Sequence, residues 1–422
     1  MFAFSGGLIN FVGDMRKFLA FIFFLLLAIP LSAQTDSLRL GFSVRGKVVD
    51  AQTGRPLESV HISIPGRHQA TVTNAEGDFV LKSDRAIEWI ECSFLGFQTR
   101  RLQAEARMNI RLRRENLLLT EASIVGADPR AILNAALDNL WDRYCPEPEL
   151  LECFYRETVQ KRSRYTYVAE AVARLYKDRY DGTVFQDAAA LEKSRVLVSQ
   201  RSRDTLSVKT MGGPTQAITH DLIKNREILF NKDDLAYYDY RMERPAYIGD
   251  RLQFVIEMIP VISVEYALFR CKVYIDRENL TFSRVEASLD VKDQAKATRM
   301  LLVSKPLGLR FFPQEASLVL NYRQVEGKTR LEYFRSIIRF DCDWRKRLFK
   351  TRYTTINELV ITDVRDEAVP IPRKERFRQR DYLSDKAREF QDPDFWKDYN
   401  IIEPTESLEH AIDRLRRQSR PR

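Results

Sequence analysis

The chain has 422 residues, of which 44% are hydrophobic and 30% are charged, the balance of a folded protein that faces water. Lysine and arginine number 68 and aspartate and glutamate 59, so the formal net charge is +9. This mild excess, without any recognition motif, argues against nucleic acid as a partner; anionic lipid head groups or cell-wall polymers suit a basic face better, and a solvated surface is the plainer explanation.

The N-terminus has the pattern of a secretory signal peptide. Arg16 and Lys17 precede an apolar run over residues 18–31, and the small residues Ser32 and Ala33 follow it. The run is shorter than the ~20 residues that a transmembrane helix needs, so we predict cleavage after Ala33 and not a retained anchor. No second hydrophobic span follows in the sequence. We therefore expect a periplasmic or outer-membrane-associated protein with no transmembrane span after signal cleavage.

Residues 44–112 form the first folded module that the sequence predicts. Apolar or small side chains stand at every second position of its strand-like runs, for example at Val44, Gly46 and Val48. Alternation with this period is typical of half-buried strands, and turn residues such as the Pro-Gly pair at 65–66 separate the runs. The sequence therefore predicts a small antiparallel β-sandwich in this part of the chain.

A set of residues in this module stands in an order that is familiar from one family. The set comprises Gly46, Asp50, Pro56, Leu57, Thr73, Asn74, Gly77 and Phe79, followed by the SFLGF string at 93–97. In this order the residues resemble the carboxypeptidase-regulatory-like domain, whose fold is a transthyretin-like β-sandwich of the seven-stranded type. That domain is a non-catalytic appendage beside a zinc peptidase, so the resemblance implies a fold and says little about peptide hydrolysis.

Similar modules precede TonB-dependent outer-membrane receptors. In those proteins a segment like LLLTEASIVGA, here at 117–127, leads into the receptor plug. A receptor barrel of about 22 strands does not fit in the residues that follow in this sequence. We therefore expect no receptor, and we interpret residues 113–127 as a linker to a second region.

A helix is predicted directly after this linker. Asp128 can cap its first turn, and Pro129 suits the first helical position. Apolar residues then recur at helical spacing and bury one face of the helix. They are Ile132, Leu133, Ala136, Leu137, Leu140 and Trp141. Pro146 and Pro148 end the helix, so the second region begins with it.

Two long strands follow over residues 153–159 and 165–177, paired through the polar KRSR turn. Their strings FYRE, AEAV and LYK resemble an uncharacterised group of exported Gram-negative proteins, in which the regulatory-like domain precedes a β-rich region. The charged residues of this signature are Arg156, Glu157, Glu170 and Lys177. The functional hypothesis is a polar cluster on one sheet face that binds a ligand. The structural alternative, which we favour, is a set of cross-strand ion pairs that stabilises the sheet.

The rest of the second region is predicted as a long antiparallel sheet with few helices. We expect a loop at 212–216, a short amphipathic helix at 220–230 and another helix within 292–306. The predicted strands cover residues 251–259, 269–276, 282–291, 315–325, 329–340 and 348–364. An antiparallel sheet of this length must curl or be covered, so the fold class is mainly β (α+β), with a β-sandwich followed by a larger curved antiparallel sheet.

Residues 230–364 resemble, in this pattern, the half-barrel of periplasmic lipoprotein carriers, in which a curved sheet wraps around a helix. The resemblance implies an apolar concave face that can hold an acyl chain or a hydrophobic peptide. The alternative is that a helix fills this face, because close packing is the default for a protein interior. The sequence leaves both open, and we favour the filled face.

The C-terminal tail, residues 366–422, contains a segment that is too apolar to stay free. Phe395, Trp396 and Tyr399 stand out in it. We expect these residues to dock on the sheet, because aromatic burial is the strongest anchor available to such a segment. A partner-binding peptide is the sharper hypothesis for the same residues. A last helix is predicted from residue 405 onward, with arginines near its C-terminal end.

Five cysteines lie in the exported part of the chain, an odd number that leaves at least one thiol without an internal partner. They are Cys92, Cys145, Cys153, Cys271 and Cys342. Cys145 and Cys153 are close in sequence, and Cys271 and Cys342 lie in strand-like runs, so either pair can form a disulfide if its Cα atoms come close enough. No spacing among the five resembles a zinc site.

Motifs of hydrolytic chemistry are missing from the sequence. None of the four histidines, His61, His68, His220 and His410, opens an H-x-x-E, and neither H-E-x-x-H nor G-x-S-x-G occurs. His61 and His68 flank one turn and can share a metal, although a structural role is commoner for such a pair. We therefore expect no enzyme activity, no catalytic residues, no cofactor and no bound metal.

The sequence as a whole predicts an exported, non-catalytic binding or assembly factor, with an envelope protein, a lipid or a cell-wall polymer as its partner. One rival hypothesis is a carrier of hydrophobic cargo, which requires an open apolar cavity. The other is a hydrolase of envelope polymer, which requires a cleft with two carboxylates, or a carboxylate and a histidine, within reach of one another. The predicted divisions are a signal peptide (1–33), a linker (34–43), the sandwich (44–112), a second linker (113–127), the β-rich region (128–365) and the tail (366–422).

Overall fold

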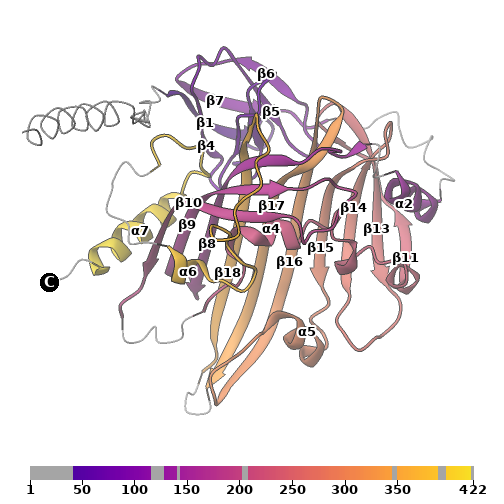
Figure 1. The fold of residues 1–422 in the computed structure, drawn as a ribbon, viewed down its shortest axis with the longest axis vertical. Coiled ribbons are helices and arrows are strands. Elements are labelled where there is room, and N and C mark those ends of the chain that lie inside the picture. Colours follow the sequence, from indigo (N-terminus) through magenta and orange to yellow (C-terminus); the bar gives the residue numbers. More distant parts are fainter. Residues whose placement is uncertain are drawn as a thin grey trace, which may run out of the picture. The chain divides into compact units, whose positions relative to one another are not determined.

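The computed structural model of the protein describes residues 41–115, 128–139, 143–201, 208–344, 349–387 and 396–419. The predicted signal peptide, the string at 117–127, Leu140, Trp141 and Phe395 lie outside these described residues. Residues Gly41–Arg422 form one compact unit. Figure 1 shows the small sandwich in indigo to purple and the large sheet in magenta to orange.

The first part of the unit is a sandwich of two small sheets, as the sequence predicted. One sheet has the order β4 (Asp78–Ser83), β1 (Phe42–Asp50), β7 (Arg107–Leu112). The other has the order β3 (Ala70–Val72), β2 (His61–Ser63), β5 (Trp89–Ser93), β6 (Arg100–Gln103). The two sheets bury a shared core that includes Val48, Ile62, Phe79, Leu81 and Ile90. The pairing of β1 with β7 is parallel, which departs from the expected antiparallel arrangement, because first and last strands are not bound by a hairpin.

The residues that carry the family resemblance build the turns and the closest backbone contacts of this sandwich. A Cβ atom on Gly46 would lie 2.5 Å from the carbonyl oxygen of Met108, so β1 can approach β7 this closely only with glycine at that position. Gly77 has a φ angle of +80°, which favours glycine as well. The side chain of Asn74 accepts hydrogen bonds from the backbone N–H groups two and four residues later, at 2.9 Å each, and so fixes the turn before β4.

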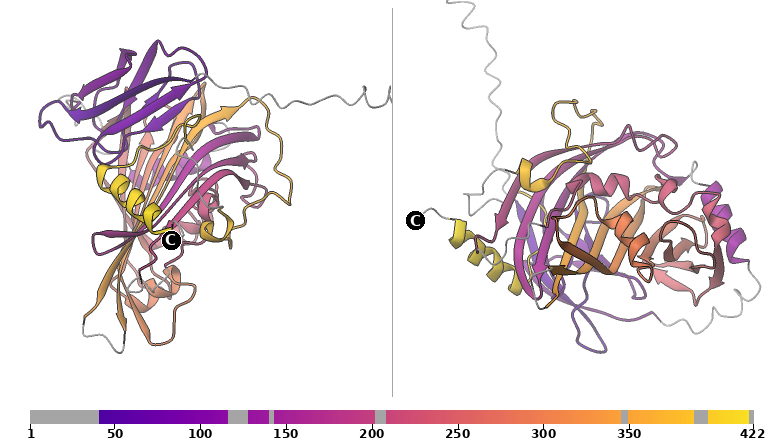
Figure 2. Two further views of the ribbon diagram at one scale, coloured as in Figure 1. Left: turned by 90° about the vertical axis from the view of Figure 1, so that its left-hand side faces the viewer. Right: turned by 90° about the horizontal axis from the view of Figure 1, so that it is seen from below.

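The second part of the unit is built on one antiparallel sheet of 11 strands, and Figure 2 shows this sheet curving. Its order is β10 (Ala188–Val198), β9 (Arg164–Lys177), β8 (Glu149–Lys161), β18 (Thr351–Arg365), β17 (Lys328–Trp344), β16 (Leu309–Val325), β15 (Phe282–Leu289), β14 (Phe269–Asp276), β13 (Arg251–Pro260) and β11 (Tyr238–Met242), with β12 (Ala246–Ile248) paired to β13. This confirms the predicted fold class. The last strand, β18, pairs with β17 on one side and with β8, the first strand of this sheet, on the other. The first and the last strand of the sheet are therefore neighbours in its interior.

Three of the helices begin close to where the sequence predicted them. Helix α2 (Pro129–Asp138) starts at Pro129, and the side chain of Asp128 accepts a hydrogen bond from the N–H of Arg130 at 2.9 Å. Helix α5 (Gln294–Leu301) is capped in the same way by Asp293 and ends ahead of Pro306. Helix α7 (Glu406–Ser419) is the predicted last helix, and the short helix α6 (Leu383–Lys386) was not predicted.

The helix predicted over 220–230 is wrong. Helix α4 (Gln216–Thr219) ends where that helix was expected to begin, and the 3-10 helix η4 (Arg226–Ile228) is a single turn inside the range. The expected loop at 212–216 likewise contains a 3-10 turn, η3 (Gly213–Thr215). The amide of Asn225 donates to the carbonyl oxygen of Thr219 at 2.7 Å, and buried partners in the connection between β9 and β10 hold other polar side chains of this stretch. These contacts outweigh the helical propensity of the stretch.

Different parts of the chain cover the two faces of the large sheet. The concave face packs against residues 211–237, which we call the inner segment; it contains η3, α4, η4 and η5 (Asp234–Tyr237), and Figure 2 shows it within the curve of the sheet. Its buried apolar side chains are Ala217, Ile218, Leu222, Ile223, Leu229, Phe230 and Leu235. The concave face is therefore filled, as we favoured, but by several short turns and not by one helix.

The sandwich and residues 396–419 of the C-terminal tail cover the opposite, outer face, whereas Phe377 and Leu383 of the tail pack in the core of the concave face. Trp396 and Tyr399 of the tail are half-buried and pack in one apolar cluster with Phe154 of β8. The side chain of Asn400 accepts a hydrogen bond from the N–H of Lys82 at 2.6 Å and donates one to its carbonyl oxygen at 2.9 Å. This segment of the tail, from Trp396 onward, therefore lies between the edge of the sandwich and the outer face of the sheet.

All five cysteines lie in the described part of the chain, and all five are buried and free, so neither of the two possible disulfides forms. Cys271 in β14 and Cys342 in β17 are separated by two strands of the sheet, which is too far for a bridge. Burial also raises the pKa of the Cys145 thiol, to about 12, which makes it a poor nucleophile. Among the described residues, we find no helix with both the length and the apolar character to cross a bilayer.

Candidate functional site

The four charged residues of the FYRE, AEAV and LYK signature come from β8 and β9, but they point to both faces of the sheet. Arg156 lies directly opposite Glu170 across the strand pair, and both side chains are on the outer face, under the tail. Glu157 and Lys177 are on the concave face with the inner segment. Neighbouring residues of a strand point to opposite faces, so Arg156 and Glu157 cannot share one. The signature therefore belongs to separate polar groups.

Glu170 is the centre of the group on the outer face. The Arg156 Nε donates to its Oε1 at 2.7 Å, and Arg195 of β10 pairs with its other carboxylate oxygen. Burial raises the pKa of Glu170, but the charges of Arg195 and Arg156 outweigh burial, so its pKa lies below the usual value. The Arg156 guanidinium also donates to the Ile402 carbonyl oxygen of the tail, at 2.6 Å. This closed group ties three strands to the tail.

Glu157 is buried between two tyrosines on the concave face. The Tyr155 hydroxyl donates to one carboxylate oxygen at 2.9 Å, and the Tyr167 hydroxyl donates to the other. Burial raises the pKa of Glu157 and outweighs the two hydrogen bonds that lower it, so the pKa is about 7. Gln216 of the inner segment donates to the Tyr155 hydroxyl at 3.5 Å, so this group also touches the inner segment.

Glu157 should make the stability of the protein depend on pH. Its pKa rises from 4.5 to about 7 on folding, so the folded state holds the proton more tightly and stability falls as pH rises through this window. At ~1.4 kcal/mol per pKa unit the total fall is roughly 3 kcal/mol. Glu157→Gln can keep hydrogen bonds to the tyrosines without titrating, so the fall should disappear. Urea unfolding across this pH range measures the difference, and parallel curves for the two proteins would contradict the prediction.

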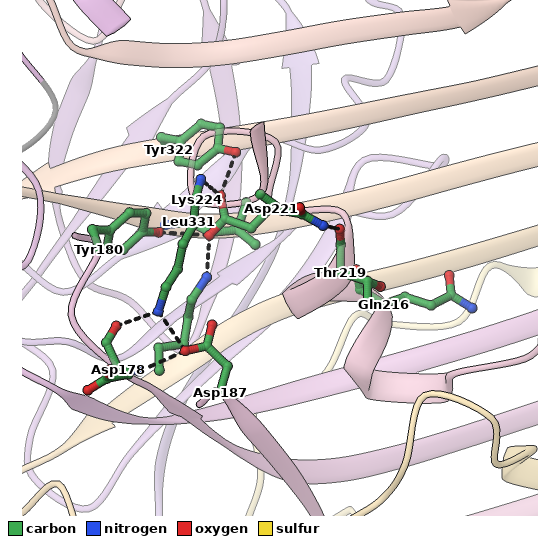
Figure 3. Close-up of polar contacts among 11 residues, drawn as sticks. Asp178, Tyr180, Asp187, Gln216, Thr219, Asp221, Lys224, Tyr322 and Leu331 are labelled. Atoms are coloured by element: carbon green, nitrogen blue, oxygen red, sulfur yellow. Dashed lines mark hydrogen bonds and ion pairs between the residues drawn. The ribbon is translucent and has the colours of Figure 1, made fainter. Parts of the chain in front are cut away.

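A third polar group connects the inner segment with the sheet, and Figure 3 shows its contacts. Asp221 of the inner segment accepts hydrogen bonds from Tyr180 at 3.0 Å and from Tyr322 of β16 at 2.9 Å, and it forms an ion pair with Lys177 of β9. The side chain of Asp221 is 0% exposed and that of Lys177 is 3% exposed. Burial lowers the pKa of Lys177, but the charges of Asp221 and Asp187 outweigh burial, so the pKa is raised and the ammonium stays charged.

Lys224 extends this group to the connection between β9 and β10. Its Nζ donates to the carbonyl oxygen of Asp178 at 2.7 Å and pairs with the carboxylate of Asp187 at 2.6 Å, as Figure 3 shows. With Lys177 and Asp221 the group contains two cations and two anions, all of them buried. Charges that are balanced and closed to solvent anchor the inner segment on the sheet; they leave little room for a ligand.

A cleft that is open to solvent lies where the sandwich meets the large sheet. Its volume is about 260 Å³. The charged part of its lining includes His61 and Glu91 from the sandwich and Arg251, Asp276, Arg323 and Glu332 from the sheet. Phe94 and Leu95, in the loop after β5, add an apolar edge. We call this the junction cleft, and it is our candidate functional site.

The centre of the junction cleft is a carboxylate held by a histidine and an arginine. The Nε2 of His61 lies 2.7 Å from Glu332 Oε1, and Arg323 Nη1 lies 3.4 Å from the same oxygen. The second guanidinium nitrogen of Arg323 donates to Ser63 at 3.1 Å. Burial raises the pKa of Glu332, but the charges of His61 and Arg323 outweigh burial and lower the pKa to about 2. Glu332 therefore stays an anion and is poorly suited to take up or release protons.

Arg251 of β13 forms the second charged contact of the cleft. Its guanidinium pairs with Asp276 of β14 and donates to the Gln324 side chain at 2.6 Å. The Arg251 side chain keeps 38% of its surface exposed. Close by, the N–H of Gly96 donates to the carbonyl oxygen of Tyr247 at 2.7 Å and joins the sandwich to the sheet. The cleft thus presents positively charged hydrogen-bond donors and negatively charged acceptors, and their mutual contacts hold these side chains in fixed positions.

A metal role for the predicted histidine pair finds no support in this geometry. Within the described ranges, no group of three or more His, Cys, Asp or Glu side chains could hold a metal ion. His61 lines the junction cleft, whereas His68 lines a different one beside Glu147 and Arg365.

Sequence reasoning singled out His61 and Lys177, but it did not find their partners in the junction cleft and in the Asp221 group. Arg323 and Glu332 lie in the predicted strands 315–325 and 329–340, which only three residues connect, so the hairpin register could have placed them close together. Asp221 and Lys224 fall within the amphipathic helix predicted at 220–230, and charged residues of such a helix are expected to face solvent. Their burial follows from the wrapping of the sheet around the inner segment, which no local pattern shows.

Comparison with known proteins identifies the first part of the chain. A family model described as the CarboxypepD_reg-like domain matches residues 44–125. The TonB-dependent receptor SusC of Bacteroides thetaiotaomicron is 30% identical over 91 residues, which make up 22% of this chain and 9% of the receptor. The chain therefore spans less than a tenth of the curated relative that it matches.

Several solved structures resemble parts of the chain weakly. They include a putative outer membrane lipoprotein-sorting protein domain from Vibrio parahaemolyticus, with 11% identity and a TM-score of 0.23, covering 56% of this chain and 93% of that one. A LolA superfamily protein from Nitrosomonas europaea has 12% identity and a TM-score of 0.18, covering 56% and 95%. MucB in complex with MucA(peri) has 13% identity and a TM-score of 0.18, covering 57% and 100%. Superpositions this poor support no conclusion about fold or function.

The family match agrees with the fold of the same residues. All seven strands of the sandwich lie within residues 42–112, and the glycines and turn residues of the resemblance have the structural roles described above. Residues 44–125 of this chain are therefore a CarboxypepD_reg-like domain.

Proposed function

We propose that the protein is a non-catalytic binding factor of the periplasm that works at the periphery of the outer membrane. In this proposal the junction cleft holds a segment of an envelope protein. The observation that carries the proposal is the lining of this cleft, where paired charges present fixed donors and acceptors beside the apolar edge of Phe94 and Leu95. A polypeptide offers backbone donors and acceptors and apolar side chains in the same short length, which suits such a lining.

Two observations favour binding over the rival functions. The concave face of the sheet is filled by the inner segment, so a hydrophobic cargo would have to displace buried charges as well as apolar side chains. The junction cleft does bring a carboxylate and a histidine together, as a hydrolase requires, but Glu332 is locked as an anion between His61 and Arg323. A general acid or base needs a pKa near the working pH, so this pair fits a positioning role better.

Photo-cross-linking in intact cells tests the proposal. The photoreactive amino acid p-benzoylphenylalanine replaces Leu95 at the edge of the cleft or, as a control, Phe185, which is 85% exposed on the β9–β10 connection. We expect a cross-link to a defined envelope protein from position 95 that position 185 does not give. Adding Arg251→Gln should weaken this cross-link roughly tenfold, because loss of an arginine contact at a binding site commonly costs more than ~1 kcal/mol.

The matched control is Arg270→Gln, which breaks an exposed pair with Glu257 elsewhere on the sheet and should leave the cross-link unchanged. Equal loss in both arginine variants would contradict a site in the cleft. If position 95 cross-links only to cell-wall polymer, the proposed protein partner is wrong and the cleft binds a glycan. Release of fragments from that polymer by the purified protein would overturn the non-catalytic assignment.

A further inference from the structure

Exposed apolar side chains gather at one end of the large sheet. Thirteen large apolar side chains are exposed in the described part of the chain. Seven of them belong to the group that we call the apolar tip: Val261, Ile262, Tyr266, Met300, Val303, Leu307 and Phe349. The other six, Phe42, Trp89, Phe185, Val198, Met211 and Val369, are scattered over the rest of the unit. Single exposed apolar residues are normal, whereas a group at one place marks an interaction surface.

Strand register places the segments of the apolar tip together. β16 begins opposite the end of β17, and β17 ends beside the start of β18, so the chain before Leu309 and the chain before Thr351 leave the sheet at one end. The end of β13, the start of β14 and the end of β15 lie toward the same end of the sheet, although Ser288 of β15 pairs with Ser317, which is 317 − 309 = 8 positions from the start of β16. Figure 1 shows this end, with α5, on the side of the sheet away from the sandwich.

Helix α5 holds the tip in place. Lys296 Nζ donates to the hydroxyl of Ser263 at 2.8 Å, and Arg299 donates to the carbonyl oxygen of Glu265 at 2.9 Å. Both contacts join the helix to the connection between β13 and β14. Ala297 of the helix is fully buried against Ala267 and neighbouring strand residues. The tip is therefore a built surface, whose apolar side chains face solvent although the chain beneath them is packed.

Basic residues surround these apolar side chains. The stretches 261–268 and 290–310 contain the cations Lys292, Lys296, Arg299, Lys305 and Arg310 against the anions Glu265, Asp290 and Asp293, a local charge of 5 − 3 = +2. Just before β18, Lys350 lies with its Nζ 4.1 Å from the ring centroid of Phe312 and follows the exposed Phe349 in the chain. A surface that enters a lipid head-group layer typically has protruding apolar side chains with lysine and arginine side chains around their base.

We infer that the apolar tip docks the protein on a lipid leaflet that contains anionic head groups. Leu307 is 101% exposed, Phe349 77% and Val303 73%, so these side chains protrude from turns. Protruding single side chains insert into a fluid layer, while a rigid protein partner needs a flatter and more continuous surface. The excess of positive charge at the same end complements the lipid and not a second copy of this basic chain. The junction cleft lies against the sandwich, so docking here leaves the cleft free.

Vesicle co-sedimentation of the whole protein tests this inference. The wild type should sediment with vesicles of phosphatidylethanolamine and phosphatidylglycerol and much less with vesicles of phosphatidylcholine alone, and added salt should weaken the binding. The triple variant Val303→Ser, Leu307→Ser, Phe349→Ser should bind at least roughly tenfold more weakly, because it removes the most exposed apolar groups of the tip. The control variant Phe185→Ser, Val369→Ser removes exposed apolar groups elsewhere and should bind like the wild type.

A label at the tip provides a second measurement. The native cysteines are buried, so a Leu307→Cys variant can be labelled with a polarity-sensitive fluorophore at that position. Its emission should shift to the blue on addition of anionic vesicles, while a Phe185→Cys label should not respond. Wild-type protein that stays in the supernatant, a triple variant that binds as well as the wild type, or self-association that the triple variant abolishes would each overturn the inference. Arg251→Gln should bind vesicles normally, so failure of the cleft proposal and failure of this one can be told apart.

Discussion

Replacing Asp221 with asparagine is expected to lower the free energy of unfolding by about 3–5 kcal/mol. The substitution keeps the shape of the side chain and one oxygen that can accept from Tyr180, while its amide nitrogen takes the place of the oxygen that accepts from Tyr322 and can donate to that hydroxyl instead. It removes the charge that faces Lys177, whose side chain is only 3% exposed. A buried ammonium without its carboxylate is far more costly than the same group in water, so the folded state loses stability while the unfolded state does not.

The pH dependence of this variant follows from the same pair. In the wild type the charges of Asp221 and Asp187 overcome the effect of burial and raise the pKa of Lys177. Without Asp221, less negative charge opposes the effect of burial, so the pKa of Lys177 falls below its value in the wild type. The variant should therefore lose more stability at acidic pH, where Lys177 must stay charged, than at alkaline pH, where it can give up its proton. Urea unfolding at both pH values gives the two free energies.

A double variant separates the charge from the rest of the contact. Lys177→Met with Asp221→Asn removes both charges and should recover a large part of the stability that Asp221→Asn loses, which gives a favourable interaction energy in the double-mutant cycle. Asp385→Asn is the matched control, since it breaks an exposed pair with Lys209 and should cost less than about 1 kcal/mol. If Asp221→Asn costs no more than this control, the Asp221 group does not anchor the inner segment.

This anchoring explains why the concave face is unlike an open carrier cavity. The inner segment is attached by two ion pairs that are closed to solvent and by the contact of Gln216 with Asn357 of β18, at 3.3 Å. Its apolar side chains share one core with the strands around it. Displacement of the segment would expose these charges and this core together, so the segment is part of the fold and not a removable occupant.

The sequence predicted much of the fold because strand periodicity and turn chemistry are local. The alternation that begins at Val44 belongs to a sandwich of seven strands, and the capping of α2 by Asp128 is as expected. The placement of β18 beside β8 could not be predicted, because it joins residues that are about half the chain apart. Pairings at such separation depend on loop closure and packing, which no short window of sequence contains.

The candidate sites were harder still to predict from the sequence, because their contacts join residues that are far apart in the chain. The pairing of Arg156 with Glu170 is the cross-strand contact that the sequence suggested, and strand alternation already implied that Glu157 points the other way. The partners of these residues come from distant parts of the chain: Arg195 from β10 for Glu170, and Asp221 from the inner segment for Lys177. Charged residues in a strand can thus be recognised early, but their roles depend on which distant segment covers each face.

Replacing Glu170 with glutamine is expected to lower the free energy of unfolding by about 3–5 kcal/mol, an effect as large as that of Asp221→Asn. Glu170 is 0% exposed and is held between Arg156 and Arg195, whose side chains are 3% and 8% exposed. Without the carboxylate, two buried guanidinium groups face one another with no anion between them. Arginine cannot relieve this repulsion by giving up a proton, because its pKa is above ~12.

The pH dependence distinguishes this effect from a simple loss of packing. The pKa of Glu170 is lowered in the folded protein, so its contribution to stability is present above the pKa of the unfolded state and is lost as pH falls through the lower folded value. The wild type should therefore approach the stability of Glu170→Gln in acid, while the gap at neutral pH stays wide. Urea unfolding of both proteins from neutral to acidic pH measures this convergence.

The tail provides an independent readout of the same substitution. Arg156 donates to the carbonyl oxygen of Ile402, and the ring of Trp396 lies 5.4 Å from the Arg195 guanidinium, so both arginines also contact the tail. Glu170→Gln should loosen the tail and speed amide hydrogen exchange around Asn400, whereas the control Glu315→Gln, which breaks a more exposed pair with Arg339, should not. Unchanged exchange in the tail of Glu170→Gln would show that the arginines hold the tail without their carboxylate.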